Sequence, residues 1–138
     1  MRIVVDTNVL LSALINPQGP PAKLIDAWRS QRCTLITSAE QLIELGGVAR
    51  RPALRDLIIP ARVGAFINDL RELAEVYARL PKVDRSIDPS DNFLLAMAEA
   101  GTADYLVSGD KRHVLALNSH GRTHIVTARQ MLTILRLD

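Results

Sequence analysis

Hydrophobic and polar positions form two alternating patterns along the chain. Short apolar runs, several of them rich in β-branched residues, are typical of buried strands and occur at 3–5, 33–37, 75–78, 104–107 and 124–127. Helical spacing and helix-start signals predict helices at 9–14, 21–31, 38–51, 60–73, 89–101, 111–117 and 128–135. Between these elements, loops are predicted at 16–21, 81–88 and 118–122.

This alternation of strands and helices predicts an α/β fold. The expected architecture is a three-layer α/β/α sandwich, in which a mostly parallel central sheet lies between two layers of helices. With 138 residues and no linker, the chain is expected to form a single domain over residues 1–138. Because ligands in such folds bind beyond the carboxyl ends of the strands, the residues that follow the strands are the first candidates for a site.

Residues of the kinds that start helices stand before two of the predicted helices. Thr7 or Asn8 is expected to cap the first helix by accepting a backbone N–H bond. Ser38, with Gln41 three residues later, matches the capping-box pattern and predicts the start of another helix.

Three glycines have an expected structural role. Gly46 and Gly47 lie inside a predicted helix, which each weakens by about 1 kcal/mol relative to alanine, so we expect a close backbone approach or a bend there. Gly101 follows the last turn of its predicted helix and is expected to be a C-terminal glycine.

Acidic residues follow two of the predicted strands. Asp6 directly follows the apolar run 3–5, where a carboxylate is costly unless its charge is compensated. Asp110 follows the strand 104–107 after a short turn. Because the carboxyl ends of parallel strands meet at one edge of the sheet, both residues are expected to face the same region.

Further acidic candidates lie on predicted helices. Asp91 stands in the first turn of the helix 89–101 and on its apolar, sheet-facing side, although an Asp at such a place is commonly only a helix cap. In the helix 38–51, Glu44 lies to one side of the apolar face and Glu40 a further step round, and periodicity does not choose between them.

Several well-known motifs are absent from the sequence, and their absence excludes some kinds of chemistry for these acids. It has no Cys/His spacing for zinc, no Gly-x-x-x-x-Gly-Lys phosphate loop and no Gly-x-Ser-x-Gly nucleophile motif. Several converging carboxylates repel one another without a cation, and Mg²⁺ and Mn²⁺ prefer oxygen ligands. With a net charge of +2, the acids would lie within an otherwise basic surface, which suits a polyanionic ligand that needs metal.

The cysteine and the three histidines are expected to be ordinary structural or surface residues. Cys33 is the single cysteine, which excludes an internal disulfide, fits a reducing compartment and is expected to be a small buried residue. His113, His120 and His124 are expected to be surface residues rather than ligands. No stretch reads as a signal peptide or a membrane span, so a cytoplasmic protein is expected.

Four short motifs also carry a family resemblance. They comprise residues 4–9, 37–45 with 50–52, 88–92, and 103–110. In this order along the chain they resemble the PIN-domain family, in particular the toxin components of bacterial toxin–antitoxin systems. The family's fold is a parallel sheet between helices, which agrees with the fold predicted from periodicity.

The resemblance implies a metal-dependent ribonuclease that uses Mg²⁺ or Mn²⁺ and cleaves RNA endonucleolytically. Carried over position by position, the catalytic and metal-binding acids are Asp6, Glu44, Asp91 and Asp110, which selects Glu44 over Glu40. Asn8 and Ser108 match the polar residues that support the site. The implied partners are the RNA substrate, a cognate antitoxin and a second copy of the chain in a homodimer, with no membrane.

Basic residues flank the acidic motifs and are candidates for contacts with the RNA backbone. They are Arg50, Arg51, Lys111 and Arg112, with Arg55 nearby. Aromatic residues make up only 4% of the chain, which argues against an extended base-stacking platform.

Two alternative functions remain. One is a catalytically silent PIN-fold module that binds RNA or a protein. The other is a phosphohydrolase with Asp6 as nucleophile, as in haloacid-dehalogenase-like enzymes. Asn8 disfavours it, because that motif has a second acid two residues after the nucleophile.

Overall fold

The computed structural model describes residues 1–109 and 114–137. In this part of the chain six strands form one sheet in the order β3-β2-β1-β4-β6-β5. The strands are β1 (Arg2–Val5), β2 (Thr34–Ser38), β3 (Glu75–Tyr77), β4 (Tyr105–Val107), β5 (Ser119–His120) and β6 (Thr123–Val126). All neighbouring strands are parallel except β5 and β6. The predicted mostly parallel sheet is confirmed.

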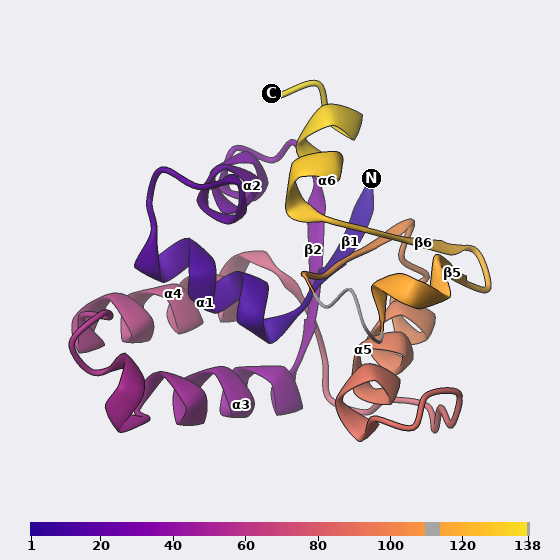
Figure 1. Cartoon of the computed structure of the whole chain (residues 1–138), viewed down its shortest axis with the longest axis horizontal. Helices are drawn as coiled ribbons and strands as arrows, with labels where there is room; N and C mark the ends of the chain where they lie inside the picture. The colour runs from indigo at the N-terminus through magenta and orange to yellow at the C-terminus, as the bar shows by residue number, and fades with distance from the viewer. Residues whose placement is uncertain (110–113, 138) are drawn as a thin grey trace.

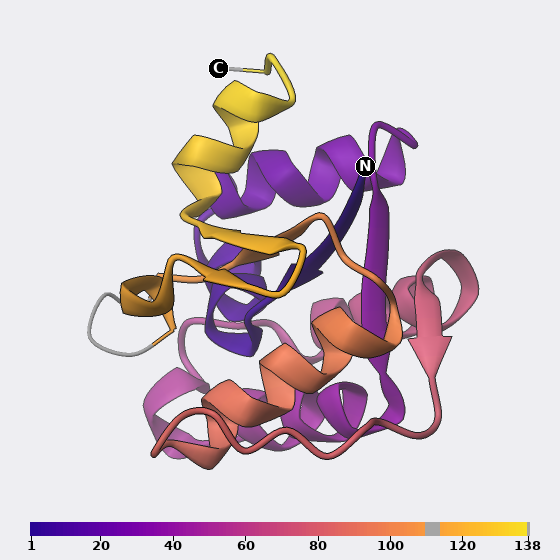
Figure 2. The same cartoon turned by 90° about the vertical axis from the view of Figure 1, so that its right-hand side faces the viewer.

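Helices cover both faces of this sheet (Figure 1). They are α1 (Thr7–Ile15), α2 (Pro20–Arg29), α3 (Ala39–Ala49), α4 (Pro60–Leu73), α5 (Pro89–Ala100) and α6 (Ala128–Ile134). Helices α1 to α4 and α6 pack on one face, and α5 crosses the other face (Figures 1 and 2). The structure is therefore the expected three-layer α/β/α sandwich. None of the described helices is long and apolar enough to cross a membrane.

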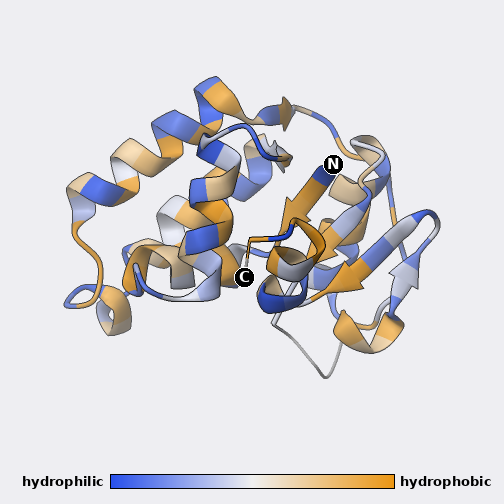
Figure 3. Ribbon diagram, turned by 90° about the horizontal axis from the view of Figure 1, so that it is seen from above, coloured by the Kyte–Doolittle hydropathy of each residue, from blue (hydrophilic) through white to orange (hydrophobic). Residues whose placement is uncertain are grey.

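Strand β1 is buried on both faces, as its uninterrupted apolar run predicts. Ile3 and Val5 belong to the core under α1 and α2, whereas Val4 belongs to the core under α5. All three are at most 1% exposed. Coloured by hydropathy, β1 is hydrophobic along most of its length, whereas the outer helices alternate hydrophobic and hydrophilic positions (Figure 3). Each outer helix thus buries one side only.

The order of the strands locates the place where a ligand is expected. From β1 the chain adds β2 and β3 on one side, and then returns to place β4 on the other side of β1. The gap between the ends of β1 and β4 is therefore the topological switch point, where open α/β sheets bind ligands. Val5 pairs with Val107, so both strands end at the same level.

Two predicted helix starts differ in detail. Helix α1 begins at Thr7 and its N-cap is Asp6, so the expectation that Thr7 or Asn8 caps it is wrong. Aspartate caps as well as asparagine or serine does, and its carboxylate lies one step earlier. At α3, Ser38 accepts the Gln41 backbone N–H at 3.1 Å, but the Gln41 side chain turns to the sheet instead of completing a capping box.

The glycines of α3 and α5 differ in how closely they are packed. Helix α3 continues through Gly46 and Gly47 to Ala49. A Cβ on Gly47 would meet nothing within 4 Å, and one on Gly46 would meet Ile67 only at an ordinary 3.6 Å, so the expected close backbone approach is wrong. Gly101 caps α5 at a φ of −91°, outside the left-handed region. A Cβ there would lie 2.6–2.9 Å from side-chain atoms of Ile36, so α5 needs glycine in order to pack against β2.

The segment after β4 holds more structure than periodicity predicts. The predicted loop 118–122 contains β5, which pairs antiparallel with β6. Two residues are too few for an alternating pattern, so this strand leaves no sequence signal. Within the predicted helix 111–117 the structure describes a 3₁₀ helix at Leu115–Leu117, and residues 111–113 lie outside the described part.

Candidate active site

Asp6 stands at the carboxyl end of β1, at the switch point. Its backbone N–H donates to the Val107 carbonyl at 2.9 Å, which keeps β1 and β4 paired to this level. One carboxylate oxygen accepts the Asn8 backbone N–H at 3.1 Å, and the other accepts the Ser108 hydroxyl at 2.9 Å. The half-buried carboxylate is thus oriented by two donors and lies at the positive end of α1.

Ser108 is placed by the next strand. Its backbone N–H donates to the Val126 carbonyl at 2.9 Å, and the residue is fully buried. Because β1, β4 and β6 are neighbours, this bond fixes the Ser108 hydroxyl against Asp6. Both residues named as supporting therefore contact Asp6, Ser108 through its side chain and Asn8 through its backbone.

Gln41 is a contact of this region that sequence reasoning missed. Its amide nitrogen donates to the Val5 carbonyl at 2.7 Å and to the Thr7 hydroxyl at 3.4 Å. Its amide oxygen accepts the Thr37 hydroxyl at 2.6 Å. Gln41 therefore binds the residues on both sides of Asp6 and joins α3 to the sheet edge. The only sequence signal at Gln41 was its capping-box position, and that signal predicted a role at the start of the helix instead.

Glu40 and Glu44 are both exposed on α3. Glu44 lies one helical turn beyond Gln41, on the same face, because residues three apart are neighbours on a helix. Glu40 lines a depression formed with the start of α5. The side of α3 that carries Gln41 and Glu44 thus begins at the edge where Asp6 lies.

Asp91 is the third residue of α5 and only 3% exposed. It is not the helix cap, because Asp88 holds that place and accepts the Ser90 backbone N–H at 2.9 Å. The Asp91 carboxylate accepts the Ser86 hydroxyl at 2.9 Å. The prediction that Asp91 faces the sheet is confirmed, and a cap role does not explain a buried carboxylate.

The loop before α5 holds Ser86 firmly. The side-chain oxygen of Asn92 accepts the backbone N–H of Arg85 at 3.0 Å and of Ser86 at 2.8 Å. The Asn92 side-chain nitrogen donates to the Ser86 carbonyl at 2.8 Å. Asn92 thus folds the loop back onto α5 and presents the Ser86 hydroxyl to Asp91. Ser86 carries no signal in the sequence, because its role depends on this loop.

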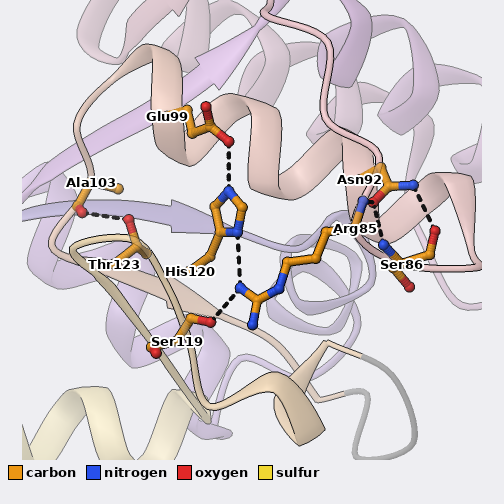
Figure 4. Close-up of polar contacts among 8 residues, drawn as sticks. All are labelled: Arg85, Ser86, Asn92, Glu99, Ala103, Ser119, His120 and Thr123. Atoms are coloured by element: carbon orange, nitrogen blue, oxygen red, sulfur yellow. Dashed lines mark hydrogen bonds and ion pairs between the residues drawn. The ribbon is translucent and has the colours of Figure 1, made fainter.

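Arg85 ties the same loop to the β5–β6 hairpin (Figure 4). Its guanidinium donates to the Ser119 carbonyl at 2.7 Å and contacts Nδ1 of His120 at 2.9 Å. A guanidinium only donates, so Nδ1 accepts and Nε2 carries the hydrogen that bonds Glu99 at 2.6 Å. His120 is therefore a structural link with a side chain 15% exposed, and the surface expectation is wrong for it. His124 is exposed, as expected.

The other predicted site residues lie elsewhere. Asp110, Lys111 and Arg112, with His113, fall outside the described residues. Arg50 and Arg51 are exposed at the far end of α3, and Arg50 is about 14 Å along the helix axis from Gln41. Arg50 and Arg51 are thus close to the acidic motif in the sequence but separated from it in space.

The donor set of the candidate site fits a hard divalent cation. Within residues 1–109 and 114–137, no group of three His, Cys, Asp or Glu side chains is close enough together to hold a metal ion. The described acids supply only oxygen donors, and Asp6 and Asp91 are each held by a hydroxyl donor. Such ligands suit Mg²⁺ or Mn²⁺ rather than zinc.

At the opposite edge of the sheet, charged residues pair with one another. Arg2 at the start of β1 contacts Glu75 at 2.8 Å, and its backbone N–H donates to Asp104 at 2.8 Å. These bonds hold the pKa of both carboxyls below their ordinary values.

Burial raises the pKa of Cys33 to about 11, which fits the small buried residue expected there. These groups are structural.

Comparison with known proteins agrees with this architecture. The family model of the PIN domain matches residues 2–112, which is most of the chain, so the protein belongs to the PIN-domain family. Over 93 residues the chain is 30% identical to the uncharacterized protein MJ1680 of Methanocaldococcus jannaschii. The match covers 67% of this chain and 54% of that protein, so the chain spans about half the length of this curated relative. PIN domains are generally nucleases that use divalent metal ions.

Proposed function

We propose that the protein is a metal-dependent ribonuclease that cleaves RNA endonucleolytically. The observation that carries the proposal is the Asp6 carboxylate, held by Ser108 and Asn8 at the switch point of a PIN-domain sheet. Asp91, buried at the start of α5, supplies the second described acid. Glu44 and Asp110 complete the proposed set of four.

These four acids are the proposed ligands of Mg²⁺ or Mn²⁺. When bound, such an ion offsets phosphate charge and lowers the pKa of water, so no side-chain nucleophile is needed. The chain's part is to hold the carboxylates in place. Ser108 and Asn8 orient Asp6, and Ser86 orients Asp91. Preorganised groups of this kind need little rearrangement when the substrate binds.

Basic side chains outside the acids are proposed to bind the RNA backbone. Arg50 and Arg51 stand exposed at the end of α3, so they would contact phosphates away from the cleaved bond. Lys111 and Arg112 directly follow Asp110 in sequence and are proposed to contact phosphates near it. Each such contact makes binding weaken as salt concentration rises.

The test is cleavage of a fluorescent RNA by purified protein with Mg²⁺, with Mn²⁺ and with a chelator. Asp6→Asn and Asp91→Asn should each lower the rate at least about 100-fold, because a charged group at the reacting phosphate is lost. Asp56→Asn is the matched control, since it removes an exposed acid outside the proposed set and should cleave like wild type.

Each alternative has its own outcome in this assay. Equal cleavage by wild type and both variants would point to a contaminating nuclease and refute the proposal. RNA binding without cleavage, in the presence of either metal, would favour the silent binding module. Hydrolysis of small phosphate esters with a phosphorylated Asp6 would favour the aspartate-nucleophile mechanism.

The biological role that we propose is that of a toxin, acting on RNA in the cytoplasm and neutralised by a cognate antitoxin. This step rests on the resemblance of the motifs to toxin components. Exposed apolar residues on and beside α3 and α4 give a protein partner, or a second copy in a dimer, a surface to cover. They are Ile43, Leu57 and Ile59.

Expression of the protein should therefore arrest growth, and co-expression of a neighbouring gene's product should relieve the arrest. Asp6→Asn is the control and should not arrest growth at the same protein level. Normal growth at a confirmed level of active wild-type protein would contradict the toxin role and leave the nuclease proposal standing.

A further inference from the structure

A depression of about 320 Å³ with a mixed apolar and charged lining lies where α3 and α5 begin. Three segments meet there: the start of α3, the loop that follows β3, and the first two turns of α5. The loop runs along α5 toward its first turn (Figure 2). Its lining includes Glu40, Leu80, Lys82, Val83, Asn92 and Phe93.

The depression shares two elements with the candidate site. Asn92 directly follows Asp91 on α5, and Glu40 lies one helical turn before Glu44 on α3. Successive residues on a helix point about 100° apart, so Asn92 places the depression round the side of α5 from Asp91. An RNA strand that runs from the acids over the start of α5 reaches it.

The apolar part of the lining is suited to a flat aromatic ligand. Phe93, Leu80 and Val83 are half-buried, pack against the core under α5 and also line the depression. The large aromatic residues Trp28 and Phe66 are instead 4% and 1% exposed. Every nucleobase has an apolar face that stacks on such a ring.

The charged part of the lining suits the edge of a base and its phosphate. Lys82 is exposed on the loop and carries the charge that attracts a phosphate. Glu40 is exposed across the depression and, when ionised, only accepts hydrogen bonds. It therefore favours bases with an exocyclic amino group, which uracil lacks.

We propose that this depression binds one base of the RNA substrate, on the strand that runs over the start of α5, with Phe93 stacking on it and Glu40 selecting amino-bearing bases. This inference rests on the proposed ribonuclease function. It assigns the base preference of cleavage to residues outside the four acids.

The first test compares KM and kcat for Phe93 variants on a short single-stranded RNA. Phe93→Leu keeps an apolar side chain but loses the ring, so KM should rise about tenfold, within the range measured for single stacked bases, with little change in kcat. Phe93→Tyr keeps the ring and should restore KM. Leu117→Ala is the control for altered packing, because Leu117 packs against the same core cluster and does not line the depression.

The second test uses RNAs that carry an abasic ribose at one position at a time. For wild type, one position near the cleavage site should raise KM about tenfold, and Phe93→Leu should abolish this difference. Substituting uridine at that position should also raise KM, and Glu40→Gln should reduce this discrimination, whereas Glu72→Gln, an exposed acid on α4, should not.

The two proposals fail in different ways. If wild type cleaves RNA with metal but Phe93→Leu and every abasic substrate keep the wild-type KM, the base site is refuted and the nuclease stands. If Phe93→Tyr fails to restore KM although it melts at the wild-type temperature, the ring is not a stacking surface. If wild type does not cleave RNA with either metal, the nuclease proposal fails and the base site fails with it.

Discussion

Asp6 has two roles that can be separated by substitution. It is the N-cap of α1, and it is a proposed metal ligand. Asparagine caps a helix about as well as aspartate, so Asp6→Asn removes the charge and leaves the cap. Asp6→Ala would lose both and cost about 0.5–2 kcal/mol of stability. The asparagine variant is therefore the informative one for function.

A second prediction about a single residue concerns Gln41 and the stability of the fold. Gln41→Ala should destabilise the fold by about 3 kcal/mol, because the buried groups that it bonds at Val5 and Thr37 lose their partner. Gln130→Ala, which removes an exposed capping glutamine, should cost about 1 kcal/mol. Urea unfolding of both variants measures the difference. Equal losses would mean that the Gln41 contacts add nothing beyond a cap.

At the scale of elements, the site is formed by contacts that hold helices against strands and loops. β1 meets α1 at Asp6, α3 is joined to the sheet by Gln41, and α5 meets the preceding loop at Ser86. The close packing of α5 on β2 at Gly101 sets the distance of this helix from the sheet. The position of Asp91 therefore depends on how closely α5 approaches.

Gly101 at the end of α5 and Gly47 within α3 should respond in opposite ways to alanine. Gly101→Ala should destabilise by about 1–3 kcal/mol, because its Cβ meets the fully buried Ile36. Gly47→Ala should stabilise by about 1 kcal/mol, because α3 gains helix propensity and the Cβ meets nothing within 4 Å. Chemical denaturation of both proteins gives the signs. A neutral Gly101→Ala would show that α5 shifts freely on the sheet.

At the scale of the whole molecule, charge is distributed between two edges of the sheet. At one edge Arg2 pairs with Glu75 and Asp104, whereas the other edge carries the proposed acids. Metal binding would link the ends of β1 and β4, with α3 and α5, into one unit. The stability of the whole domain should therefore depend on metal.

Wild-type protein should melt several degrees higher in Mn²⁺ or Mg²⁺ than in chelator. A ligand at about 100 times its Kd adds about 2.7 kcal/mol to a folded state that alone binds it. Asp6→Asn and Asp91→Asn should lose this increase, and Asp56→Asn should keep it. Calorimetric melting curves measure the effect without any RNA. An equal increase in all four proteins would place the ion elsewhere.

Much of this protein was predictable from local pattern. The apolar run 3–5 predicted β1, and the helical spacing of 60–73 predicted α4. Both signals depend only on residues that are close together in the sequence. The two-residue β5 and the need for glycine at 101 were not predictable. Each depends on a contact with a residue far along the chain or on an element too short to show a period.

The sequence by itself determined most of the succession of strands and helices along the chain, the burial of β1 and Asp91, and the acidic residues offered by the motifs. Only the tertiary structure decided which polar groups meet at them. Ser108 reaches Asp6 across 102 residues, and Gln41 reaches Val5 across 36. Local pattern carries no information about such pairs, because packing of the sheet and helices brings them together.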